Sequence, residues 1–160
     1  MWYLHGPRRQ QAGDGRRSFA EMTRSEWLAL IRARGVRPGP AAAPTLLREA
    51  ERRLGHPLPA ALDLLYLAAD GLFNDAGQWW VVWPLTRVVD DTLAAWKTGL
   101  DHGLIAFGDD GTGNPFCVRI TGEDPTVLRW NWIDLGVESP AGPIGDFLSE
   151  WAGIPLWPPP

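Results

Sequence analysis

The spacing of the apolar residues changes near Asp70–Gly71, and this change constrains the fold more than any other feature. Before it, apolar residues recur every three or four positions, which is typical of amphipathic helices. After it come short runs rich in valine and aromatic residues, such as "QWWVVWPL" at 78–85, which are typical of strands. Helices followed by strands predict an α+β fold with a mainly antiparallel sheet.

Three helices are predicted before the change, at residues 23–35, 45–54 and 60–69. Thr23 and Glu26 fit a capping box, in which each side chain accepts a hydrogen bond from a backbone N–H of the other residue. The segment "RPGPAAAP" at 37–44 is predicted to be a linker, because its three prolines exclude a helix.

After the change, the sequence predicts strands at 78–85, 104–107, 115–120 and 126–132, a helix at 86–98 and a closing helix within 141–153. "GEDP" at 122–125 has the composition of a turn. The closing helix is expected to turn four apolar side chains inward: Ile144, Phe147, Leu148 and Trp151. We therefore expect a sheet packed against N-terminal helices and this C-terminal helix.

A length of 160 residues favours one main domain. We expect a disordered leader at 1–22, an extra helix and proline-rich linker at 23–43, and the main folded domain at 44–157. No apolar run reaches the roughly 20 residues that span a bilayer, and the N-terminus lacks the apolar segment of a secretory signal. A single cysteine excludes an internal disulfide, so the expected location is the cytoplasm.

Charge is distributed unevenly along the chain. Residues 1–40 hold eight arginines and three acidic residues, a balance of +5, whereas residues 41–160 hold seven basic and sixteen acidic residues, a balance of −9. An acidic body repels phosphate backbones and attracts basic partners. We therefore expect a basic protein partner, with no direct binding to nucleic acid or to a membrane.

The stretch "FGDDGTGNPFCVRI" at 107–120 raises several alternatives. The spacing from Asp110 to Asn114 is similar to the start of a calcium-binding EF-hand loop, but Pro115 and Thr121 stand where that loop needs Gly and Glu. A phosphate cradle needs a helix after the glycines, whereas here a strand follows. Neither a metal nor a cofactor is therefore predicted.

Catalysis by this stretch is also weighed. Cys117 lies in a strand pattern, where alternation places it with Arg119 opposite Phe116 and Val118, and no histidine is near it by spacing. A carboxylate pair such as Asp109–Asp110 could act as a general acid and base, which leaves an enzyme open as a minor hypothesis. Asp-Asp-Gly between two strands is ordinary turn chemistry, so we favour a turn with a surface contact and expect no enzyme.

Three blocks in order resemble the SUKH superfamily, the Smi/Knr-type domains. "LLREAERRLGHPLPAALDLLYLAADGLF" is similar to the opening signature, "LIAFGDDGTGNPFCVRI" to the central hairpin, and "VLRWNW" with "IGDFLSEW" to the late strand and closing helix. The signature positions are held by Leu47, Glu51, Leu54, Gly55, Leu58, Pro59 and Gly71. The resemblance covers about residues 44–151. Asp70 departs from it, because Asn is commoner before Gly71.

The resemblance implies a protein-binding domain without enzymatic activity. Bacterial domains of this kind are known mostly as immunity proteins that bind a toxin, often a nuclease, while fungal relatives regulate cell-wall synthesis and signalling. The Ala, Arg, Gly and Pro content is typical of a bacterium with a high-GC genome. The leading hypothesis is thus an immunity protein that neutralises a cognate, basic toxin as a monomer or weak homodimer. The alternative is a regulatory interaction domain with no toxin partner.

Partner contacts are predicted from the tryptophans and from the turn. Trp side chains supply much of the binding energy when a partner buries them. Alternation along 126–132 places Trp130 and Trp132 on one face and leaves Arg129 and Asn131 on the other. The candidate partner-binding residues are Trp79, Trp80, Asp109, Asp110, Asn114, Arg129 and Asn131.

Overall fold

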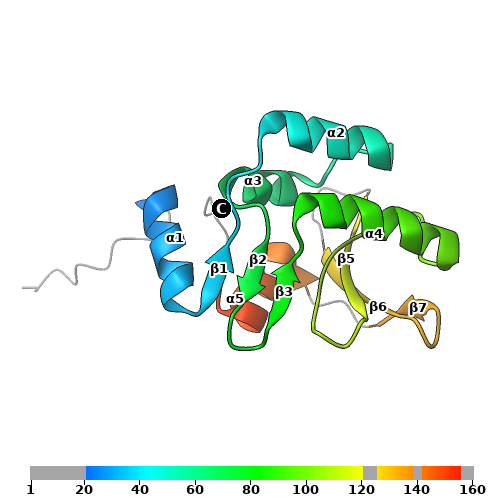
Figure 1. Cartoon of the computed structure of the whole chain (residues 1–160). Helices are drawn as coiled ribbons and strands as arrows, with labels where there is room; N and C mark the ends of the chain where they lie inside the picture. The colour runs from blue at the N-terminus through cyan, green and yellow to red at the C-terminus, as the bar shows by residue number, and fades with distance from the viewer. Residues whose placement is uncertain (1–20, 121–125, 139–141, 156–160) are drawn as a thin grey trace, which may run out of the picture.

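A computed structural model describes residues 21–120, 126–138 and 142–155, and it confirms the predicted α+β fold (Figure 1). The helices in these residues are α1 (Arg24–Ala33), α2 (Pro44–Leu54), α3 (Ala60–Ala68), α4 (Leu85–Thr98) and α5 (Ile144–Ala152). The strands are β1 (Val36–Pro38), β2 (Leu72–Asn74), β3 (Trp79–Val82), β4 (Leu104–Asp109), β5 (Pro115–Arg119), β6 (Thr126–Asn131), β7 (Gly136–Val137) and β8 (Gly142–Pro143). The helices expected near 23–35, 45–54, 60–69, 86–98 and 141–153 are confirmed.

The strands form two antiparallel sheets that lie next to each other. One has the order β1-β2-β3, and the other has the order β4-β5-β6-β7 with β8 also paired to β6. The Trp83 N–H donates to the Phe107 carbonyl at 2.7 Å, which joins β3 to β4. Gly108 permits this approach, because a Cβ atom at that position would stand 2.0 Å from the Val81 carbonyl oxygen.

Helices cover the strands from both sides. Both figures show the strands between α4 on one side and α5 on the other, and Figure 1 shows α2 running beside α4. One cluster of buried side chains connects the elements, and its fully buried members include Trp27, Tyr66 and Phe107. No helix of the described residues is long and apolar enough to cross a membrane.

The segment before the second helix is part of this core. The predicted capping box of Thr23 and Glu26 is confirmed, and Met22 packs against the core cluster. The Arg24 guanidinium donates twice to the Ala68 carbonyl, at 2.9 and 2.6 Å, and the Trp27 indole N–H donates to the Pro155 carbonyl at 2.6 Å. These bonds fix α1 between the end of α3 and the C-terminal segment. Of the leader expected at 1–22, residues 1–20 lie outside the described residues.

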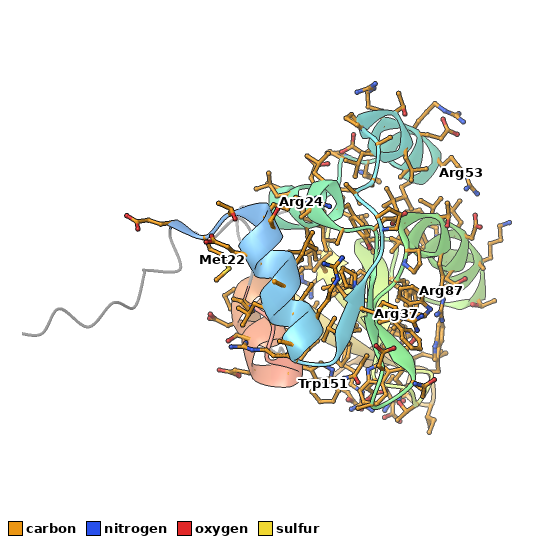
Figure 2. All side chains as sticks on the ribbon, turned by 60° about the vertical axis from the view of Figure 1, so that its left-hand side comes forward. Met22, Arg24, Arg37, Arg53, Arg87 and Trp151 are labelled. Carbon is orange, nitrogen blue, oxygen red and sulfur yellow. The ribbon has the colours of Figure 1, made fainter. Side chains whose placement is uncertain are left out.

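Two expectations about this region and the closing helix were wrong. Residues 37–44 were expected to be only a linker, but β1 extends into them, because Pro38 ends a short edge strand and needs no N–H for the ladder. Trp151 was expected to face inward, but 47% of its surface is exposed (Figure 2). Trp151 lies in the last turn of α5. One face of its ring packs on Phe116 and Phe147, and the other side is exposed to solvent. The turn expected at 122–125 lies outside the described residues.

The predicted alternation of β5 does not translate into one buried and one exposed face. Phe116, Cys117 and Val118 are all buried, and only Arg119 is exposed. The reason is the position of β5, which lies between β4 and β6 in a sheet covered by helices on both sides. Phe116, for example, meets Phe147 of α5 with ring centroids 4.6 Å apart.

The signature residues of the first block hold turns together. The Glu51 carboxylate accepts a hydrogen bond from the Leu58 N–H at 2.9 Å, which fixes the loop between α2 and α3. Gly55 ends α2 with a φ of +74°, a conformation that favours glycine. Asp70 accepts from the Leu85 N–H at 2.7 Å and so caps α4, whose own N-cap residue is Pro84. The departure from Asn at position 70 therefore keeps an acceptor at the start of α4.

Candidate functional site

The turn between β4 and β5 is built from the two adjacent aspartates. Asp109 accepts a hydrogen bond from the Gly111 N–H at 2.7 Å, and Asp110 accepts from the Thr112 N–H at 2.9 Å. Gly111 and Gly113 have φ of +82° and +91°, which only glycine adopts without strain. The turn chemistry predicted for this stretch is confirmed, and both carboxylates take part in it.

Asp109 also joins the turn to α4. Its second carboxylate oxygen accepts from the Trp83 indole N–H at 2.7 Å and lies 3.6 Å from an Arg87 guanidinium nitrogen. The guanidinium stands 4.3 Å over the Trp83 ring and pairs with Asp91 at 3.0 Å. Figure 2 shows Arg87 on the α4 side of the strands. Only 13% of the Asp109 side chain is exposed, so little of this carboxylate is left for a partner.

A groove of about 180 Å³ opens beside this cluster. It is lined by Trp83, Arg87, Asp91, Ala95, Ala106, Asp109, Gly113, Pro115 and Trp132. Two tryptophans form aromatic walls, and the polar groups between them already bond to one another. The groove is therefore a partly apolar depression at the edge of the candidate site.

A second chain of ion pairs runs from the turn across β6. Arg129 reaches Asp110 at 3.2 Å, and its Nε lies 3.3 Å from Glu138, within ion-pair distance but without the geometry of a hydrogen bond. Asn131 donates to Glu138 at 2.8 Å. Asn114 accepts from the Trp132 N–H at 3.3 Å. These contacts bring together five of the seven predicted partner-binding residues: Asp109, Asp110, Asn114, Arg129 and Asn131.

The electrostatics of Asp110 follow from these contacts. Only 7% of its side chain is exposed. Burial raises the pKa of this carboxyl, but the hydrogen bonds from Thr112 and the charge of Arg129 outweigh burial and lower the pKa below its ordinary value. Asp110 is therefore a charged structural group at neutral pH and is poorly suited to act as a general acid.

Trp79 and Trp80, the two remaining candidates, lie on β3 in the other sheet. Both are half-buried. Trp80 packs edge-to-face on Phe73 with ring centroids 5.1 Å apart, and the Arg37 guanidinium covers Phe73 at 4.9 Å. No described contact joins these tryptophans to the turn aspartates, so the predicted residues do not form one continuous set.

Sequence reasoning missed the most exposed apolar group of this end of the molecule. Three aliphatic side chains of the β6–β7 hairpin are exposed, and we call them the apolar tip: Ile133 and Leu135 in the turn and Val137 in β7, exposed by 89%, 57% and 41%. The available signal was "NWIDLGVE", where aliphatic residues alternate with polar ones and Gly through a turn. Such a pattern is also typical of a strand with one buried face, which is why the periodicity alone did not identify an exposed turn.

The surroundings of Cys117 and of the histidines bear on two alternatives, a cysteine nucleophile and a metal site. Burial raises the pKa of the Cys117 thiol to about 12, so the thiolate that a nucleophile needs is scarce at neutral pH. His56 is exposed, and His102 stacks on Trp96 with ring centroids 5.3 Å apart. The described residues hold no group of three or more His, Cys, Asp or Glu side chains that could bind a metal ion.

The signature residues and the polar turn of this α+β domain serve the fold, and apolar groups are exposed beside them. A model of the SMI1 / KNR4 family (SUKH-1) matches residues 41–151, which is more than half of the chain. The chain therefore belongs to this family. A search of curated proteins finds no match. Helix α1 and strand β1 precede the matched segment, yet they contribute Trp27 and Val36 to the same core.

Proposed function

We propose that this chain is an immunity protein, which binds a cognate bacterial toxin in the cytoplasm of the producing cell and neutralises it. It acts by covering the toxin's working surface and catalyses no reaction of its own. Membership of the SMI1 / KNR4 family supports a role in binding a protein partner. The identity of that partner as a toxin is our proposal.

The distribution of charge carries this proposal. After residue 40 the chain holds seven basic side chains against sixteen acidic ones. Among the described residues, four of these basic side chains form ion pairs: Arg52 with Glu49, Arg53 with Asp90, Arg87 with Asp91, and Arg129 with Asp110. The excess of carboxylates is therefore left to act on a partner.

This excess suits a toxin that works on nucleic acid. Such a toxin needs a basic surface to hold phosphates, and an acidic protein of the right shape competes for that surface. Opposite charges also speed association, and an immunity protein must reach its toxin before the toxin reaches its substrate. A regulatory domain without a toxin partner would not require this speed.

The proposal is tested by co-expression with the protein encoded by the adjacent gene. We expect the chain to restore growth of cells that express the neighbouring protein. We further expect isothermal titration with an inactive variant of that protein to give a tight complex whose Kd rises with salt. Failure to restore growth, with binding only to signalling or cell-wall proteins, would support the regulatory alternative instead.

A further inference from the structure

The apolar tip, Ile133, Leu135 and Val137, makes little contribution to the fold. The Ile133 side chain is 89% exposed although isoleucine is among the residue types most often buried. Leu135 approaches the end of α4, where a Cβ atom on Gly99 would stand 3.6 Å from a Leu135 methyl group. Three exposed aliphatic side chains within five residues of one hairpin offer apolar surface that a partner can bury favourably.

The backbone at Leu135 also does not favour leucine. Its φ is +49°, in the left-handed region that glycine and asparagine occupy readily and that leucine occupies only at a cost in free energy. Folding alone would be served better by Asn or Gly at this position. A leucine kept in that conformation and left 57% exposed is explained if its side chain is needed outside the chain.

The turn is held in one shape before any partner arrives. The Asn131 side chain accepts hydrogen bonds from the Ile133 and Asp134 N–H groups, at 2.8 and 3.4 Å, and donates to Glu138 at 2.8 Å. Arg129 and Trp132 tie the same turn to the β4–β5 turn through Asp110 and Asn114. A rigid apolar group loses little conformational entropy on binding, which raises affinity.

The charges around the tip indicate what kind of surface receives it. Asp134 lies in the turn between Ile133 and Leu135, and Glu138 follows Val137. The end of α4, which Leu135 approaches at Gly99, adds exposed Lys97 in the last turn of the helix and exposed Asp101 in the loop after it. Arg129 pairs with Glu138, so the three carboxylates Asp101, Asp134 and Glu138 stand against two cations, Lys97 and Arg129.

We propose that the apolar tip inserts into an apolar pocket of the partner whose rim carries lysine or arginine. This inference rests on the proposed function, because it takes the partner to be a basic protein. A second copy of this chain fits less well, since it would place acidic rims against each other.

The test places a photo-activated cross-linking amino acid at position 133 of the full chain, in cells of the source organism, and identifies the adduct by mass spectrometry. Leu64 serves as the matched position, because it is an exposed leucine on α3, 44% exposed, away from the tip. We expect a covalent adduct with one basic protein from position 133 and none from position 64.

The captured protein, purified in an inactive form, is then titrated with two variants. Leu135→Asn should raise the Kd about tenfold or more while the thermal midpoint stays equal or increases, because Asn tolerates this φ better than Leu. Leu64→Gln should leave the Kd unchanged. This opposite response of affinity and stability separates a binding role from a structural one.

The remaining outcomes distinguish the two proposals. If position 64 rather than position 133 captures a basic protein, and Leu135→Asn leaves the Kd for that protein unchanged, the proposed role of the tip is wrong and the proposed function stands. If position 133 captures only a second copy of this chain, the tip is a self-association surface and the inference is overturned. If no position captures a partner, both proposals fail.

Discussion

Two turns lie side by side in this molecule, and they use their side chains in opposite ways. The β4–β5 turn is rich in charge, yet Asp109 and Asp110 bond to the backbone, to Trp83 and to arginines, and their side chains are only 13% and 7% exposed. The Asn131 side chain holds the β6–β7 turn, and Trp132 ties it to Asn114 of the other turn, yet Ile133 and Leu135 stay exposed. The polar turn therefore supports the fold, while the apolar turn is free to serve a partner.

This difference teaches that conspicuous residues are not always the functional ones. A buried carboxylate is retained because its hydrogen bonds replace those that it had with water, so an Asp-Asp-Gly turn can be explained by folding alone. An exposed isoleucine in a turn has no such explanation within the chain. Side chains that the fold does not require are the better guide to a binding surface.

Asp109→Ala tests the structural side of this comparison and should have the largest effect. It leaves the Trp83 and Gly111 N–H groups without their acceptor, so we expect the free energy of unfolding to fall by roughly 2–3 kcal/mol. Urea denaturation measures the loss. Asp134→Ala, at an exposed aspartate of the other turn, is the control and should change stability by less than about 0.5 kcal/mol. Equal effects of the two variants would contradict the comparison.

Asp110→Asn should have an intermediate effect that depends on pH. The pKa of Asp110 is lowered in the folded chain, so its contribution to stability is complete above the unfolded pKa of about 3.9 and is lost as pH falls through the lower folded pKa. At neutral pH we expect a loss of roughly 1–2 kcal/mol. Thermal melts of both proteins from about pH 7 to about pH 3 should show the difference shrinking with acid. A constant difference over this range would show that Asp110 carries no net charge interaction.

Ile133→Ser should have the smallest effect on stability. The side chain is 89% exposed, so the free energy of unfolding should change by no more than about 0.5 kcal/mol. Circular dichroism melts provide the measurement, and Ile144→Ser, at a buried isoleucine of α5, provides the matched control with a loss of roughly 2 kcal/mol or more. A large loss from Ile133→Ser would mean that the tip supports the fold, which would remove the contrast between the two turns.

The β4–β5 turn of the candidate site could be located from the sequence, but the exposed apolar tip could not. Aspartate and glycine in a short stretch predicted the β4–β5 turn, because their preferences act over two or three residues. The bond from Trp83 to Asp109 joins residues 26 positions apart, and no local pattern contains it. Asp109 and Asp110 were therefore predicted as partner contacts before their internal partners were visible.

The sequence by itself determined the elements whose signals are local. The α+β class, the five helices of the described residues and the capping box at Thr23 follow from spacing within about four residues along the chain. Tertiary structure alone decided the rest. The short strands β1, β2, β7 and β8 exist through their pairing, β5 is buried on both faces through its neighbours, and Trp151 and the apolar tip are exposed because of where their elements end. Burial depends on what the rest of the chain brings next to a residue, and that information is spread over the whole fold.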